Sequence, residues 1–178
     1  AATIWLTWTV AVDLLPYLNK YENVNVDLFI LNKRNNFFYL EKDNHYNVFY
    51  SSSSSYRSIN HIFEIAKVAE DYDLVHAHLF YPQYYCALGK VLRLINKPLI
   101  MTEHSTNNKR RNKIFFKLIE KEIYSQYEKI ICISDGVKKS LLNWQPDLGN
   151  RMVVVNNGVD INKFREAKPI DLSNEIDF

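Results

Sequence analysis

Short apolar runs alternate with amphipathic segments along most of the chain, and this alternation predicts strands joined by helices. The clearest unit covers residues 73–104. Apolar runs at 73–78 and 98–104 each end in histidine, and a helical pattern at 82–95 separates them. Because two parallel strands need a long crossover, this unit is typical of a parallel β-α-β arrangement.

The same alternation continues on both sides of this unit. We predict further strands at residues 24–31, 48–50, 129–133 and 151–155, and helices at 58–69, 113–127 and 134–144. The fold class is therefore α/β, a Rossmann-like parallel sheet with helices on both faces.

The start of the chain is predicted to be helical rather than extended. Residues 1–21 carry Ile4, Trp5, Trp8, Val12, Leu15 and Leu18 at helical spacing. A doubly wound fold normally opens with a strand and a Gly-rich turn, so we expect this first strand to be missing from the sequence. We place the lobe at residues 1–164 and a linker toward a second lobe at 165–178.

Composition argues against several classes of protein, namely nucleic-acid-binding, disulfide-bonded and membrane-spanning proteins. The formal net charge of the 178 residues is only +2, which gives no support for nucleic acid as a partner. Cys86 and Cys132 lie in apolar segments without a disulfide or metal spacing, as in a cytoplasmic protein with reduced thiols. Asp13 and Pro16 interrupt the apolar start, which argues against a signal peptide or a membrane span.

Polar residues follow four of the predicted strands, beginning with His76 and His78 and with Glu103 and His104. Ser134 follows the third strand, and Asn157 and Gly158 follow the fourth, in a turn where Gly158 can adopt a positive φ. The carboxyl ends of parallel strands form the edge at which open α/β sheets bind ligands. We therefore expect His78 and His104 on one rim, with His76 deeper in the core.

Four motifs in this order resemble a known family. They are DLVHAH at 73–78, TEH at 102–104, ICIS at 131–134 and VVNNGVD at 154–160, followed by Phe164. Together they resemble the N-terminal lobe of glycosyltransferase family 4, whose retaining enzymes have the two Rossmann-like lobes of the GT-B fold. The resemblance covers residues 1–164 and implies that this lobe receives the acceptor, while an absent C-terminal lobe holds a nucleoside diphosphate sugar. We then expect no other cofactor and no activity from this lobe alone.

The resemblance also implies residue roles. His104 is placed beside the reacting centre as the catalytic residue. The residues expected to bind acceptor or substrate are His78, Glu103, Ser105, Lys109, Ser134, Asn157 and Gly158. Ser105 and Lys109 could bind the phosphate of a lipid-linked acceptor. Basic residues from Lys109 to Lys117, next to Phe115 and Phe116, could lie against an anionic membrane on its cytoplasmic side, or form an ordinary solvated turn.

Several alternatives stay open at this point. The lobe could bind a glycan or phosphate without catalysis, and His76, His78, Glu103 and His104 could form a zinc site, although the resembling family needs no metal. A dinucleotide-dependent oxidoreductase is disfavoured because the G-x-G-x-x-G turn is not seen. The serines at 51–55 are interpreted as a flexible connection, with phosphate binding as the alternative. Surface polysaccharide is the expected product.

Overall fold

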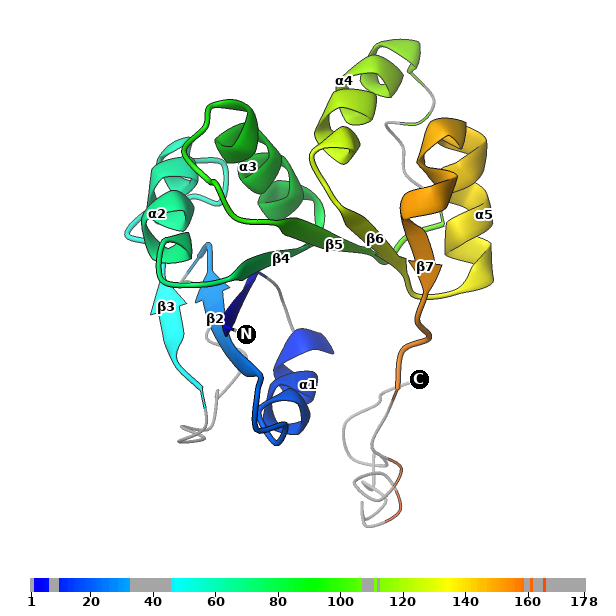
Figure 1. Ribbon diagram of the computed structural model, residues 1–178. Coiled ribbons are helices and arrows are strands. Elements are labelled where there is room, and N and C mark those ends of the chain that lie inside the picture. Colours follow the sequence, from blue (N-terminus) through cyan, green and yellow to red (C-terminus); the bar gives the residue numbers. More distant parts are fainter. Residues whose placement is uncertain are drawn as a thin grey trace, which may run out of the picture.

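The computed structural model describes residues 2–6, 10–32, 46–106, 111, 113–158, 161 and 165. The strands are β1 (Ala2–Leu6), β2 (Asn25–Ile30), β3 (Val48–Tyr50), β4 (Leu74–His78), β5 (Leu99–Glu103), β6 (Lys129–Cys132) and β7 (Met152–Val154). The helices are α1 (Val10–Leu18), α2 (Asn60–Ala69), α3 (Phe80–Val91), α4 (Ile114–Ser125) and α5 (Asp135–Trp144), with a 3-10 helix at Pro146–Arg151. Figure 1 shows this arrangement.

The strands of the described residues form one parallel sheet in the order β3-β2-β1-β4-β5-β6-β7. Its first six positions have the strand order of a Rossmann sheet, and β7 extends that sheet. From β1 the chain moves outward to β2, whereas from β4 it moves the other way to β5. The switch point therefore lies between β1 and β4, and the predicted fold class is confirmed.

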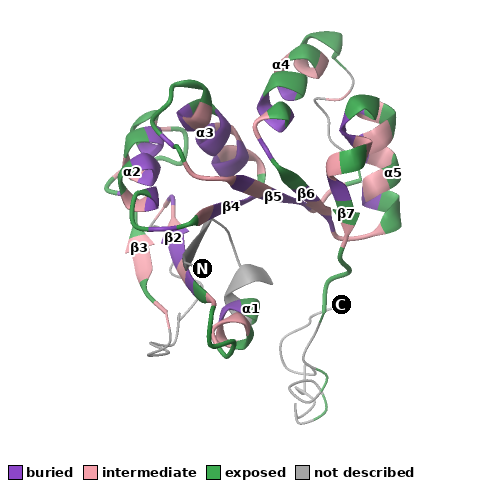
Figure 2. Cartoon of the chain, in the orientation of Figure 1, coloured by how far each residue is buried: buried purple, intermediate pink, exposed green. Residues whose placement is uncertain are grey.

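Helices cover the two faces of the sheet unequally. α1 lies on one face, and α2 and α3 lie on the other (Figure 1). The larger core joins α2 and α3 to buried residues of α4 and α5, whereas a smaller core under α1 contains Leu15, Val26 and Leu28. Figure 2 shows that buried residues are concentrated in the central strands and on the inner sides of α2 and α3.

The prediction for the first residues is wrong. Residues 2–6 form β1, which pairs with both β2 and β4, and the helix begins only at Val10. The first strand of the fold is therefore present. A central parallel strand is covered on both faces, so it lacks the alternation of polar and apolar residues that marks a half-exposed strand. In the sequence, the apolar residues of β1 and of α1 together fit one helical spacing, so the two elements were predicted as a single helix.

The serine segment after β3 is also more ordered than a flexible connection. The Ser51 hydroxyl lies 2.9 Å from Nδ1 of the fully buried His61, and it accepts a hydrogen bond from the Ser53 amide. The Ser52 hydroxyl donates to Glu64 on α2. These bonds attach the segment to the first half of α2.

Both cysteines are buried and free, as predicted. None of the helices within the described ranges has the length and apolar character to cross a membrane. The predicted linker at 165–178 lies almost entirely outside the described residues, and the lobe boundary stays a prediction.

Candidate functional site

His78 and His104 meet at the carboxyl edge of the sheet. His78 is the last residue of β4, next to the switch point, and His104 directly follows β5. Their rings are 5.5 Å apart between centroids, and Nδ1 of His78 lies 3.3 Å from Nε2 of His104. The prediction that the two histidines share one rim is confirmed. His78 is only 4% exposed, however, whereas His104 is half-buried, so His104 is the more accessible of the two.

His76 continues this pair into the core. Its ring lies 4.1 Å from that of His78 between centroids, and its Nε2 lies 2.8 Å from the hydroxyl of Thr102. Residues two apart on a strand point to the same face, so His76, His78, Thr102 and His104 all lie on the face that α1 covers. We call His76, His78 and His104 the histidine row. His76 is a core histidine, as predicted.

Burial sets the charge of the histidine row. It lowers the pKa of His76 to about 3, with a smaller contribution from His104. It also lowers the pKa of His78 well below the ordinary value, and the neighbouring imidazoles add to this. The pKa of His104 is lowered by burial as well. All three imidazoles are therefore neutral at pH 7, and each carries one N–H donor and one nitrogen lone pair.

The turn after His78 has a strained backbone. Leu79 is the single residue between β4 and α3, and its φ of 65° and ψ of 166° belong to a region that glycine normally occupies. This conformation lets α3 begin at Phe80, immediately after the strand. Backbone strain of this kind is often retained at functional sites, and here it fixes the end of β4 at the histidine pair.

Glu103 does not lie beside His104, and its predicted contact with substrate stays a prediction. As its neighbour on the strand it points to the opposite face of the sheet, where it is only 7% exposed. Its carboxylate accepts hydrogen bonds from the Ser105 amide (3.2 Å) and the Tyr124 hydroxyl (3.4 Å). Glu103 thus connects the loop after His104 to α4.

Arg111 completes this second buried group. Its guanidinium lies 3.8 Å from the Glu103 carboxylate and donates to the Ser140 hydroxyl at 2.9 Å, and its side chain is 9% exposed. Arg111 is therefore not part of a solvent-facing basic cluster, which corrects that expectation. Lys109 lies outside the described residues, so its predicted phosphate contact stays a prediction.

The remaining predicted residues follow β5, β6 and β7. Ser105 is half-buried next to His104, and Ser134 caps α5 by accepting a hydrogen bond from the Val137 amide. Asn157 and Gly158 are exposed beyond β7, the edge strand, roughly 10 Å from β5 by strand spacing. Gly158 does not have a positive φ, so the turn does not use the conformational freedom that glycine offers there. Their substrate contacts stay predictions.

Within the described ranges, no group of three or more histidine, cysteine or acidic side chains is arranged to hold a metal ion. The zinc alternative included Glu103 as a ligand, and the Glu103 side chain points to the opposite face of the sheet from the imidazoles. Sequence reasoning missed Thr102 and Leu79. The position of Thr102, two residues before His104, would have placed it on the same face.

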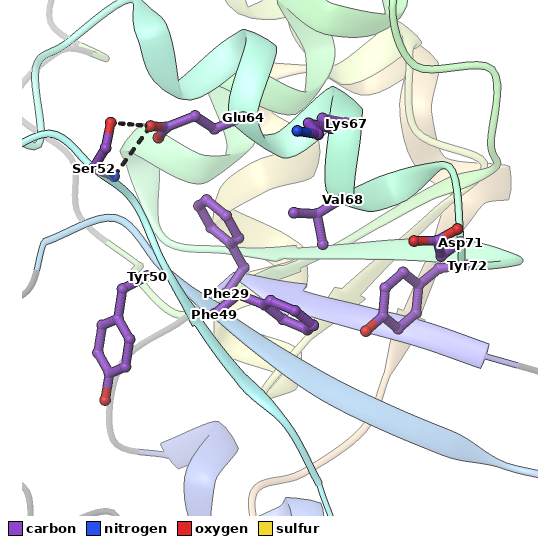
Figure 3. Close-up of a pocket in the computed structure, with 9 residues that line it drawn as sticks. All are labelled: Phe29, Phe49, Tyr50, Ser52, Glu64, Lys67, Val68, Asp71 and Tyr72. Atoms are coloured by element: carbon purple, nitrogen blue, oxygen red, sulfur yellow. Dashed lines mark hydrogen bonds between the residues drawn. The ribbon is translucent and has the colours of Figure 1, made fainter.

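A separate cavity of about 370 Å³ lies between α2 and the strands β2 and β3 (Figure 3). Its lining residues are Phe29, Phe49, Tyr50, Ser52, Glu64, Lys67, Val68, Asp71 and Tyr72. None of the predicted site residues is among them. The cavity adjoins β3, the edge strand at the other end of the sheet from β7, so it is distinct from the histidine row.

The doubly wound sheet with a polar rim at its carboxyl edge is that of a Rossmann-like lobe, and it matches one lobe of the GT-B fold. The family described as Glycosyltransferase Family 4 matches residues 7–163. The chain therefore belongs to glycosyltransferase family 4.

Solved structures share the fold at low sequence identity. A glycosyltransferase from Rickettsia africae has a TM-score of 0.68 at 18% identity, with 94% of this chain and 46% of that chain covered. HepE from Anabaena, in complex with UDP and glucose, has a TM-score of 0.65 at 14% identity, with 90% and 45% covered. UDP-GlcNAc 2-epimerase from Neisseria meningitidis, bound to UDP-GlcNAc, has a TM-score of 0.60 at 16% identity, with 88% and 45% covered.

The chain thus spans less than half the length of these structures. No curated protein sequence matches it.

The strain at Leu79 predicts an unusual effect of glycine. Leu79→Gly should raise the free energy of unfolding by about 1 kcal/mol, because relief of 1–3 kcal/mol of strain outweighs the 0.5–1 kcal/mol entropic cost of glycine. Leu92→Gly is the matched control, since Leu92 is also an exposed leucine but has a φ of −76°. It should lower the free energy of unfolding in urea. Equal destabilisation by both variants would contradict strain at Leu79.

The buried Glu103 predicts a pH effect on stability. Burial raises the pKa of Glu103 above its usual 4.5, although Arg111 opposes this. A raised pKa in the folded state favours folding of the protonated form, so this contribution is lost as the pH rises through the folded pKa. Compared with Glu103→Gln, the wild type should therefore gain stability as the pH falls from neutral toward 4.5.

Urea unfolding at a series of pH values measures this difference. Tyr124→Phe should enlarge the gain, because the Tyr124 hydroxyl lowers the pKa of Glu103. If the difference in the free energy of unfolding between wild type and Glu103→Gln does not change with pH, Glu103 titrates like an exposed carboxyl and the prediction is wrong.

Proposed function

We propose that the full-length protein is a retaining glycosyltransferase of the hexosyltransferase type. It moves a sugar from a nucleoside diphosphate sugar to a glycan or lipid-linked acceptor, and this lobe receives the acceptor. The observation that carries the proposal is the contact of His78 with His104 at the carboxyl edge of the sheet, in a chain of glycosyltransferase family 4.

Glycosyl transfer changes bonds and charges at known atoms, and the site must stabilise these changes. The acceptor hydroxyl oxygen forms a bond to the anomeric carbon, the bond from that carbon to the diphosphate breaks, and the hydroxyl proton departs with the leaving phosphate. The sugar ring gains positive charge and the diphosphate gains negative charge. A neutral His104 can hydrogen-bond a hydroxyl of the sugar or the acceptor and hold it in position for the reaction.

The charge on the diphosphate needs cations or several amide donors. Arg111 is engaged by Glu103 on the other face of the sheet, so it is not offered to the rim that holds His104. We assign binding of the diphosphate to a second lobe. UDP sugars are the first donors to test, because HepE from Anabaena was crystallised with UDP and glucose.

We also infer that the protein works at the cytoplasmic face of a membrane, in the synthesis of a surface polysaccharide. Three apolar residues of α4 form an exposed patch: Ile114 is 77% exposed, Phe115 67% and Leu118 69%. Lys113 and Lys117 belong to the same segment, and the combination of cations with an apolar patch suits an anionic lipid surface. Phe116 is half-buried and contributes less than we expected from the sequence.

His104→Ala should lower kcat for sugar transfer by about 100-fold or more, because a group that positions the reacting atoms is lost. The fold should survive, since His104 is half-buried. The full-length protein is assayed with a panel of UDP sugars, and transferred, hydrolysed and epimerised products are separated. Turnover close to wild type in His104→Ala, or an epimerised sugar as the product, would refute the proposal.

Phe115→Ser should weaken binding to vesicles that contain an anionic lipid by roughly 10-fold, because one phenyl ring no longer enters the interface. Phe63→Ser is the matched control, since Phe63 is 55% exposed but lies on α2. Vesicle sedimentation of the full-length protein measures both. Equal binding by the two variants, or binding that does not depend on anionic lipid, would contradict the membrane role of α4.

A further inference from the structure

The contact between His78 and His104 joins two particular nitrogens. Nδ1 of His78 faces Nε2 of His104 at 3.3 Å. Both rings are neutral at pH 7, so one of these nitrogens must carry the proton and the other the lone pair. The direction of this hydrogen bond decides what the remaining nitrogen of His104, Nδ1, can offer to a ligand.

Tautomer preference favours one direction. A neutral histidine side chain in water favours the form with the proton on Nε2. When both rings take this form, Nε2–H of His104 donates to the lone pair on Nδ1 of His78. The opposite direction would require the less favoured Nδ1–H form in both rings, so the intrinsic preference of the rings, and not the distance between them, selects the first direction.

The surroundings hold His78 in the orientation that this bond needs. The ring of His76 lies against it at 4.1 Å between centroids, and His76 is itself held by the Thr102 hydroxyl at 2.8 Å. The strained turn at Leu79 fixes the end of the strand. Glu103, the nearest acid in the sequence, lies on the other face of the sheet and cannot replace His78 as the acceptor for His104.

We propose that His78 is a positioning residue: it fixes His104 as the Nε2–H tautomer and so leaves the lone pair on His104 Nδ1 to accept a hydrogen bond from a hydroxyl group of the substrate. The kinetic consequence rests on the proposed function, whereas the tautomer itself does not. The inference specifies that the group recognised by His104 is a hydrogen-bond donor, such as a sugar or acceptor hydroxyl, and not a carbonyl or phosphate oxygen.

Nitrogen-15 NMR of the full-length protein with labelled histidine tests the tautomer. The chain contains five histidines, and the signals of the pair are assigned by their loss in His78 and His104 variants. In the wild type, His104 should show a protonated Nε2 and an unprotonated Nδ1. A protonated Nδ1 on neutral His104 would overturn the proposal.

Three substitutions of His78 separate its hydrogen bond from its packing. His78→Phe keeps a ring but removes the acceptor, so His104 should become a mixture of tautomers. His78→Asn places an amide oxygen near the position of Nδ1 and should restore the Nε2–H form. His78→Gln places its amide nearer the position of Nε2 and should not restore it. An unchanged His104 tautomer in His78→Phe would also overturn the proposal.

The kinetic measurement follows the same series. His78→Phe and His78→Gln should lower kcat by about 10- to 100-fold, as is usual for groups that orient a functional histidine, and His78→Asn should recover most of it. Thermal unfolding of each variant shows whether the fold is retained. Normal kcat in a folded His78→Phe variant with mixed tautomers would disprove the positioning role. If the wild type transfers no sugar, the proposed function fails, and the NMR result still decides the tautomer.

Discussion

Alternation of side chains along β4 and β5 is the constraint on which the site depends. The parallel pairing sets His76 opposite Ile100 and His78 opposite Thr102, so the histidine row forms on one face of the sheet. Val75, Ala77, Met101 and Glu103 take the other face. A shift of either strand by one residue would exchange these two sets. The buried Leu99 and Met101, which belong to the large core, oppose such a shift because it would turn them toward α1.

The two faces therefore carry separate polar systems. The histidine row is neutral, and its members contact one another and Thr102. On the opposite face, buried carboxylates connect the helices to each other and to the sheet: Glu120 accepts hydrogen bonds from the Trp144 indole (2.7 Å) and the Tyr84 hydroxyl (3.3 Å). Buried carboxylates need such partners. They fix α4 between α3 and α5, and thereby determine which side of α4 exposes its apolar patch.

Sequence patterns predicted the sheet well wherever a strand ended in a polar residue, as at His78, His104 and Ser134. They failed at β1, because the apolar residues of this short strand continue the helical spacing of α1, which follows a few residues later. They also placed Glu103 beside His104, although a period of two residues already assigns the two to opposite faces. The burial of Arg111 could not be predicted, because its partner Ser140 is 29 residues away on another helix.

The neutrality of the histidine row indicates which part of the substrates each lobe of a two-lobed enzyme would bind. A buried imidazole without charge can exchange hydrogen bonds with hydroxyl groups, but it contributes little against the growing charge of a leaving diphosphate. Under the proposed function a rim of this kind suits the acceptor and the sugar, and the charge of the nucleotide needs a different surface. Burial keeps the imidazoles neutral, and Glu103 holds Arg111 on the opposite face of the sheet. Both effects leave less positive charge at the edge where His104 lies. This lack of positive charge favours the proposed division, in which this lobe orients hydroxyl groups and another surface binds phosphate.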